Sequence, residues 1–104
     1  MDFVFVYITA KDKEQALAIG KTLVEERLAA CVNVIDGMTS IYRWEGEICT
    51  DSEAVLIAKT SSERFEALAA RVKQLHTYTC PCIVSLPVIG GSSGYLEWLA
   101  GQVG

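Results

Sequence analysis

The sequence has no run of like charges, no low-complexity stretch and no internal repeat, which argues against a disordered arm or a solenoid. Its 9 Lys and Arg residues are outnumbered by 13 Asp and Glu residues, and no expected helix gathers basic residues on one face. The basic surface that phosphate backbones require is missing, so we expect no nucleic-acid partner. The apolar run FVFVYI near the start is too short for a secretion signal or a membrane span. We therefore predict a cytoplasmic protein with no membrane partner.

Histidine is scarce, with His76 the single one, and the usual motifs of nucleotide and metal sites are missing. The stretch GGSSG lacks the lysine and the strand-to-helix frame of a phosphate-binding loop, which excludes a nucleotide site of that class. The four cysteines show no C-x-x-C spacing, so no recognisable zinc motif is present. In a cytoplasmic protein we expect these cysteines to remain thiols.

The sequence does contain a clear succession of periodic segments. The β-branched and aromatic run at residues 2–8 predicts a central strand. The pair Asp12 and Gln15 resembles a capping box, and the apolar residues after it recur at helical spacing, which predicts a helix up to about residue 30. Two β-rich runs at 31–44 and 47–60 meet at a Glu-Gly pair, which predicts a long β-hairpin.

The second half of the chain predicts another helix, a strand and a terminal helix. Thr60 and Glu63 form a second capping pattern, and the apolar stripe that follows it ends at His76. The run IVSLPVI predicts a strand whose proline marks an edge or a break. After GGSSG, a short helix is expected to open near Ser92 or Ser93.

The order of these elements predicts the fold. Strand, helix, strand, strand, helix, strand is the βαββαβ order of the ferredoxin-like plan. The expected class is α+β, an antiparallel sheet with two helices on one face and a C-terminal helix, forming one domain over residues 1–104. Gly37 predicts a bulge or bend in the long central hairpin. The outer half of that hairpin has too few apolar residues to rest on the chain's own core, so we expect another surface to cover it.

The segment HTYTCPC, residues 76–82, holds the main candidate for a metal site. If it is extended, Cys80 and Cys82 face the same way, and two soft thiolates could hold a soft cation such as Cu(I), with His76 nearby. As a zinc site the cluster is one ligand short of the usual four. Two other interpretations stay open: ordinary buried thiols, or a nucleophilic pair of His76 with one cysteine. No organic cofactor is predicted.

The stretch SIYRW offers a different kind of site. Tyr42 and Trp44 occupy alternate positions and so share one face of a strand, and Lys59 ends the paired strand. Together they could line a polar and aromatic cleft for a small anion. The alternative is that these aromatic residues pack against a neighbouring subunit, where such residues are enriched.

Several stretches together resemble the CutA divalent-cation-tolerance family across nearly the whole chain. They are ERLAACVNVIDGMTSIYRWEGEI at residues 26–48, SEAVLIAKT, LPV and GYLEWL, in the family's order and at its spacings. The resemblance implies a ferredoxin-like subunit in a tight homotrimer, with the long hairpin extending the sheets between subunits. It also implies a link to tolerance of copper and other divalent cations, with metal ions as partners.

The family's usual form of the HTYTCPC segment is His-Pro-Tyr-Glu-x-Pro-Glu. The histidine, tyrosine and proline recur as His76, Tyr78 and Pro81, but both carboxylates are gone. A metal bound here would therefore need Cys80 and Cys82 in their place, which moves the preference toward Cu(I) or zinc.

These observations predict a cytoplasmic homotrimer that binds copper or another metal ion and acts in metal homeostasis, not as an enzyme. The predicted metal ligands are His76, Cys80 and Cys82. Tyr78 is expected to contact the ligand at a cleft between subunits. The alternative hypothesis is a trimeric signalling module resembling the PII proteins, in which Tyr42, Trp44 and Lys59 bind a small anionic metabolite between subunits.

Overall fold

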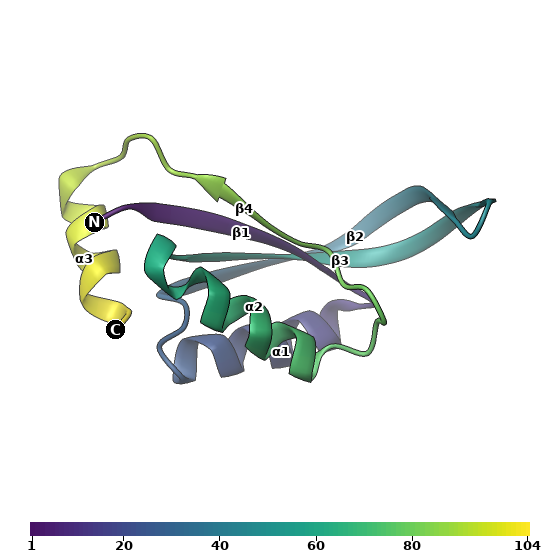
Figure 1. Cartoon of the computed structure of the whole chain (residues 1–104), viewed down its shortest axis with the longest axis horizontal. Coiled ribbons are helices and arrows are strands. Elements are labelled where there is room, and N and C mark those ends of the chain that lie inside the picture. The colour runs from purple at the N-terminus through teal and green to yellow at the C-terminus, as the bar shows by residue number, and fades with distance from the viewer.

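The computed structural model describes residues 1–104. The elements in chain order are β1 (Phe3–Ala10), α1 (Lys13–Glu25), β2 (Cys31–Trp44), β3 (Glu47–Ser61), the 3₁₀ turn η1 (Ser62–Arg64), α2 (Phe65–Leu75), β4 (Ile83–Pro87) and α3 (Ser93–Gln102). The strands form one antiparallel sheet in the order β2-β3-β1-β4 (Figure 1). This arrangement confirms the predicted α+β, ferredoxin-like βαββαβ fold with its C-terminal helix.

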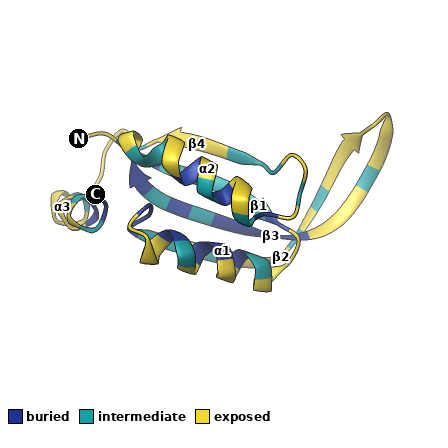
Figure 2. Ribbon diagram, turned by 60° about the horizontal axis from the view of Figure 1, so that its bottom comes forward, coloured by how far each residue is buried: buried dark blue, intermediate teal, exposed yellow.

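The main core lies between the sheet and the two helices α1 and α2, which cover the same face (Figure 2). Alternate residues of β1 point into this core, and Val6 and Ile8 have no exposed surface. Leu23 from α1 and Leu68 from α2 are also fully buried. Burying these apolar stripes against the sheet is the main stabilising contribution, about 1.5–3 kcal/mol for each fully buried large side chain.

The opposite face of the sheet is not covered by α1 or α2, and α3 meets it only at one end, where Phe3 lies in one apolar cluster with Leu99. Tyr7 pairs with Val84 and Phe5 pairs with Leu86, so these side chains share this open face. Val84 and Leu86 are 50% and 53% exposed. An antiparallel sheet that faces water normally carries polar residues on that side, so this open face is unusually apolar.

Helix α1 is shorter than the sequence pattern predicts. Asp12 caps it as expected, because its carboxylate accepts a hydrogen bond of 2.8 Å from the backbone N–H of Gln15. The helix ends at Glu25 and not near residue 30, because Arg27 adopts a left-handed backbone with φ of 58°. The N–H of Leu28 then bonds back to the carbonyl of Leu23, which closes the helix end as in a Schellman motif.

The second predicted capping box is wrong. Strand β3 continues through Thr60 to Ser61, and no side chain caps η1 or α2. The Thr60 hydroxyl donates instead to the carbonyl of Leu28 at 2.7 Å. Thr60 is fully buried, and a buried hydroxyl needs a partner, so this bond ties the end of β3 to the segment after α1.

The long hairpin forms as predicted. Glu45 and Gly46 have φ of 50° and 81°, as the two central residues of a tight hairpin turn require. The strand register shifts between Ile35 and Met38, where Gly37 has φ of 77°, which confirms the bulge. Beyond the bulge the hairpin extends past the helices, and its outer half is largely exposed (Figure 2).

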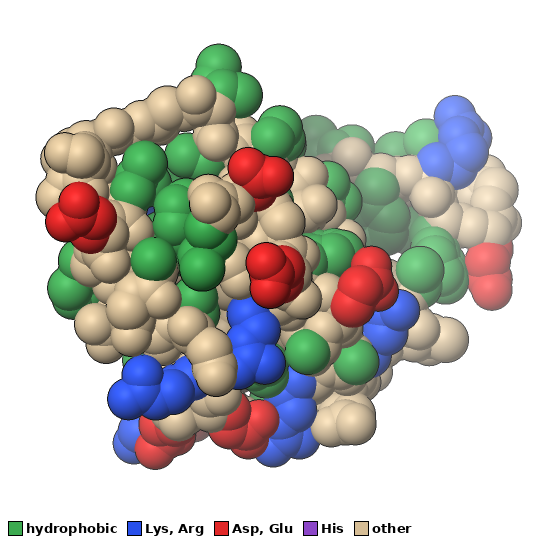
Figure 3. All heavy atoms as spheres, turned by 60° about the vertical axis from the view of Figure 1, so that its left-hand side comes forward, with side chains coloured by type: hydrophobic (Ala, Val, Ile, Leu, Met, Phe, Trp, Pro, Cys, Tyr) green, Lys and Arg blue, Asp and Glu red, His purple; other side chains and the backbone are tan.

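The C-terminal part adds a smaller apolar cluster at the other end of the sheet. Strand β4 is an edge strand and holds Pro87, as predicted. Helix α3 packs Leu99 against Phe3 and Ala30. Figure 3, in which the α3 end comes forward, shows apolar side chains gathered on this part of the surface. None of the helices combines the length and apolar character needed to span a membrane.

Candidate functional site

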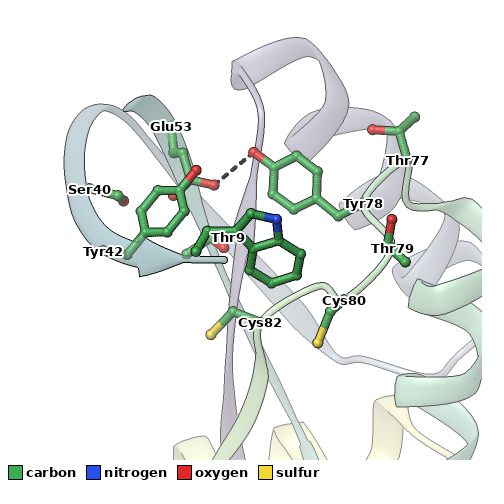
Figure 4. Close-up of a pocket in the computed structure, with 10 residues that line it drawn as sticks. Thr9, Ser40, Tyr42, Glu53, Thr77, Tyr78, Thr79, Cys80 and Cys82 are labelled. Atoms are coloured by element: carbon green, nitrogen blue, oxygen red, sulfur yellow. Dashed lines mark hydrogen bonds between the residues drawn. The ribbon is translucent and has the colours of Figure 1, made fainter. Parts of the chain in front are cut away.

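A cavity of about 540 Å³ lies where the hairpin leaves the body of the protein. One wall comes from β2 and β3, and the other comes from the loop between α2 and β4 (Figure 4). Its lining residues are Thr9, Ser40, Tyr42, Trp44, Glu53, Thr77, Tyr78, Thr79, Cys80 and Cys82. A volume of this size is typical of sites for small molecules.

The hairpin contributes two aromatic rings. Tyr42 and Trp44 are alternate residues of β2, so they share the face that lines the cavity, and they are 40% and 51% exposed. The Tyr42 hydroxyl donates a short hydrogen bond to the carboxylate of Asp51 on β3. This bond raises the pKa of Tyr42 to about 12.

His76 fixes the start of the loop that forms the other wall. It follows the last residue of α2, and its Nε2 donates to the carbonyl of Thr9 at 2.7 Å. Its Nδ1 accepts from the N–H of Tyr78 at 3.1 Å. Because a carbonyl can only accept, these two bonds require the tautomer with the proton on Nε2. The His76 ring also packs against the Tyr78 ring, with 4.5 Å between the centroids.

Tyr78 connects the loop to the hairpin through a buried carboxylate. Its hydroxyl donates to Oε2 of Glu53 at 2.7 Å, and Glu53 is only 8% exposed (Figure 4). Burial, followed by the hydrogen bond and the negative charge of Glu53, raises the pKa of Tyr78 above its ordinary value. The phenol therefore stays protonated and keeps its donor role at any physiological pH.

The two thiols of the CPC segment line the same cavity. Cys80 is exposed and Cys82 is partly buried, and all four cysteines of the chain are free. Burial raises the pKa of the Cys82 thiol, and the negative charges of Glu53 and Cys80 raise it further. An activated cysteine nucleophile needs the opposite shift, so the environment of Cys82 does not favour nucleophilic catalysis.

No three side chains of His, Cys, Asp and Glu form a group that could hold a metal ion. Cys80 and Cys82 are in place at the cavity, but His76 does not line it, and both of its ring nitrogens already have partners. Coordination through His76 would require the loss of one of these hydrogen bonds. The ligand set of His76 with the two cysteines therefore stays a prediction.

The structure brings together only some of the residues predicted to bind an anion. Tyr42, Trp44 and Tyr78 come together at the cavity, but Lys59 does not line it. The Lys59 amine lies instead over the rings of Phe5 and Tyr95, at 5.4 Å and 5.7 Å from their centroids. No lysine or arginine lines the cavity, so nothing in this chain offers a positive charge to an anion there.

Glu53 is the important residue that sequence reasoning missed. It lies on β3 opposite Met38, immediately before the buried stretch AVLI. An acidic residue directly before an apolar run of a strand is unusual, and this was the one feature of the sequence that could have drawn attention to Glu53. The sequence does not indicate its hydrogen-bond partner Tyr78, which is 25 residues away.

Comparison with known proteins places this geometry in a family. A model of the CutA1 divalent ion tolerance protein matches residues 4–102. The chain belongs to the CutA1 family. The divalent-cation tolerance protein CutA of Thermus thermophilus is 52% identical over 99 residues, which cover 95% of this chain and 96% of that protein. The chloroplastic protein CutA of Arabidopsis thaliana is 43% identical over 92% of this chain, which spans only 53% of the plant protein.

Solved CutA1 structures have the same fold. The structure of the Thermus thermophilus protein superimposes on this chain with a TM-score of 0.96 at 51% identity. The superposition covers 98% of this chain and 99% of the Thermus thermophilus chain. CutA1 from Oryza sativa superimposes with a TM-score of 0.97 at 40% identity, over 99% of this chain and 94% of that chain. The family and its Thermus thermophilus member are named for cation tolerance and not for an enzymatic reaction.

Proposed function

We propose that this CutA1 protein acts in the cell's tolerance of divalent and other metal ions by binding a soft cation, Cu(I) or Zn(II), and not by catalysis. The observation that carries the proposal is the position of Cys80 and Cys82, which both line a cavity whose single charged lining residue is Glu53. The names of the family and of its bacterial relatives support a role in tolerance. We place this role in the cytoplasm, although the plant relatives are named chloroplastic and an Archaeoglobus fulgidus CutA structure is described as periplasmic.

The donor set fits a soft ion better than a hard one. Thiolates select Cu(I) and zinc, whereas magnesium and calcium need several oxygen ligands. Two thiolates are sufficient for Cu(I), while zinc would need further donors, and no third His, Cys, Asp or Glu side chain is grouped with the two cysteines. Thiols must lose their protons to coordinate, so binding of the ion would release protons.

The charge of the cavity argues against the signalling module that binds an anionic metabolite. A cavity lined by one carboxylate and no basic side chain repels an anion. Such a module would need its positive charges from another subunit.

The test is an anaerobic competition titration of the reduced protein with Cu(I) and, separately, with Zn(II). We expect tight binding of at most one ion per chain, which the Cys80→Ser, Cys82→Ser variant loses. The matched control is Cys31→Ser, Cys49→Ser, which removes two thiols that do not line the cavity and should bind as the unmodified protein does. Equal loss in both variants, or no loss in the first, would contradict the proposed site. An unchanged affinity in His76→Ala would remove His76 from the ligand set.

We also propose that the protein works as a homotrimer. The apolar open face of the sheet and the exposed outer hairpin both lack a partner within one chain, which supports an assembly. The resemblance of the chain to the CutA family implies three subunits.

A further inference from the structure

The charge of Glu53 has no counterpart in the chain. Glu53 is 8% exposed, and the one ion pair of the protein joins Arg71 to Glu26 and does not include Glu53. Its single hydrogen bond comes from the Tyr78 hydroxyl. A carboxylate that is largely removed from water and has no cation beside it is energetically unfavourable. Binding of a positively charged ligand next to it would therefore lower the free energy.

One oxygen of Glu53 is free to meet such a ligand. Oε2 accepts from Tyr78, whereas Oε1 accepts no hydrogen bond. Every fully buried side-chain oxygen of the protein has a partner, so Oε1 must keep some surface open, and the residue lines the cavity. The cavity thus presents an acceptor with a negative charge and no donor assigned to it.

Three aromatic rings stand around the same space. Tyr42 and Trp44 come from β2, and Tyr78 comes from the opposite wall (Figure 4 labels both tyrosines). Both phenols donate to carboxylates, Tyr42 to Asp51 and Tyr78 to Glu53, so their rings are electron-rich. The faces of such rings attract cations, and aromatic cages are the usual binding sites of organic ammonium groups.

The size of the cavity distinguishes an organic ligand from a metal ion alone. Its volume of about 540 Å³ greatly exceeds the ~30 Å³ that one water molecule occupies in the liquid. A bare ion would leave most of this space to water, whereas a small organic molecule would fill it. The hydroxyl groups of Ser40 and Thr79 at the lining offer further hydrogen bonds.

We propose that this cavity binds a small protonated aliphatic amine, with the ammonium group donating to Oε1 of Glu53 and its carbon chain against the rings of Tyr42, Trp44 and Tyr78. The amine site uses the hairpin and Glu53, and it does not depend on a metal at the two cysteines.

The test uses putrescine, a diamine with two protonated amino groups, and the assembled, reduced protein after treatment with a chelator. In a Trp98→Phe background Trp44 is the sole tryptophan, so its fluorescence reports on the cavity. We expect a saturable change with putrescine that weakens as salt is added, and none with succinate, a dianion of similar length. No saturable change with putrescine, or an equal change with succinate, would overturn the proposal.

Two variants connect the binding to the residues named. Glu53→Gln keeps an acceptor for the Tyr78 hydroxyl but removes the charge, and we expect at least about tenfold weaker binding, since hydrogen bonds to charged groups are the strong ones. Glu66→Gln on the exposed start of α2 removes the same charge elsewhere and should bind normally. Equal affinity in Glu53→Gln and the unmodified protein would overturn the assignment.

A second variant, at the half-exposed Trp44, tests the amine site if Glu53→Gln fails to fold. Trp44→Leu removes a half-exposed ring, and calorimetry should show a loss of putrescine binding with an unchanged circular dichroism spectrum. Retained binding would overturn the proposal. The Cys80→Ser, Cys82→Ser variant separates this site from the metal site, because it should lose Cu(I) and keep putrescine. The metal site and the amine site are therefore tested separately, and a negative result for one does not contradict the other.

Discussion

His76 organises the loop around the cavity through both nitrogens of its ring. Nε2 donates to Thr9 on β1, and Nδ1 accepts from the backbone of Tyr78, which places the Tyr78 phenol against Glu53. The His76 side chain is 9% exposed, and both of these hydrogen bonds are partly shielded from water. His76 is thus a positioning residue for Tyr78 in the structure, whatever part it takes in binding a metal.

Replacement of His76 should therefore lower stability. In His76→Ala the carbonyl of Thr9 and the N–H of Tyr78 lose these part-buried hydrogen bonds, and we expect the free energy of unfolding to fall by about 1–3 kcal/mol. Urea denaturation followed by circular dichroism measures this change. Thr79→Ala, a change at an exposed position of the same loop, is the control and should cost much less. Equal midpoints for His76→Ala and the unmodified protein would show that the two bonds contribute nothing.

The sequence predicts part of this site and misses the part that depends on long-range contacts. The alternation of Tyr42 and Trp44 is a local property of a strand, so their common face follows from spacing alone. The pairing of Tyr78 with Glu53 depends on how the loop packs against the hairpin, which spacing does not encode. The position of Lys59 also depends on long-range packing. The strand continues past it to Ser61, and its amine lies over the rings of Phe5 and Tyr95 and not at the cavity.

At the scale of elements, periodicity predicts where helices and strands lie more reliably than where they end. The apolar spacing after α1 continues to residue 30, but Arg27 leaves the helical region, and a left-handed arginine has no signature in sequence. The capping pattern at Thr60 misleads for a related reason. A threonine hydroxyl can bond a helix N–H or a distant carbonyl, and here the carbonyl of Leu28 is the acceptor.

Close packing of α1 against the sheet depends on Gly20. A Cβ at this position would lie 2.8 Å from Cγ1 of Val32 and 3.2 Å from Cδ1 of Leu56. Alanine improves helix propensity by about 1 kcal/mol over glycine. Overpacking costs about 1–3 kcal/mol, and at 2.8 Å the Val32 methyl group would have to shift to admit the added carbon. We expect Gly20→Ala to lower the free energy of unfolding in chemical denaturation.

A second change in the strand tests the cause. If the Val32 methyl group is the obstacle, Gly20→Ala should cost less in a Val32→Ala background, with a coupling energy of about 0.5–3 kcal/mol. Four proteins, the two single variants, the double variant and the unmodified chain, complete the cycle. Strict additivity would exclude the contact between positions 20 and 32 as the source of the loss.

The whole molecule has apolar surfaces that its own chain leaves uncovered. Its extents are 45 × 25 × 22 Å, and the long dimension includes a hairpin that no helix supports. Composition alone only suggests such an interface, because an apolar residue on an exposed strand looks the same in sequence as one in the core. The fold distinguishes the two cases, since it assigns Val84 and Leu86 to the face of the sheet opposite α1 and α2, where both side chains are about half exposed.

A charge placed on that open face should dissociate the proposed trimer. Leu86 is 53% exposed in the single chain, and a lysine there would have to lose its water in an interface, which is costly without a partner charge. We expect light scattering after size exclusion to give the mass of three chains for the unmodified protein and a lower mass for Leu86→Lys. Leu17→Lys is the matched control, because Leu17 is 49% exposed but lies on α1, on the other side of the sheet. A single-chain mass for the unmodified protein, or a trimer that survives Leu86→Lys, would mean that this face is not the interface.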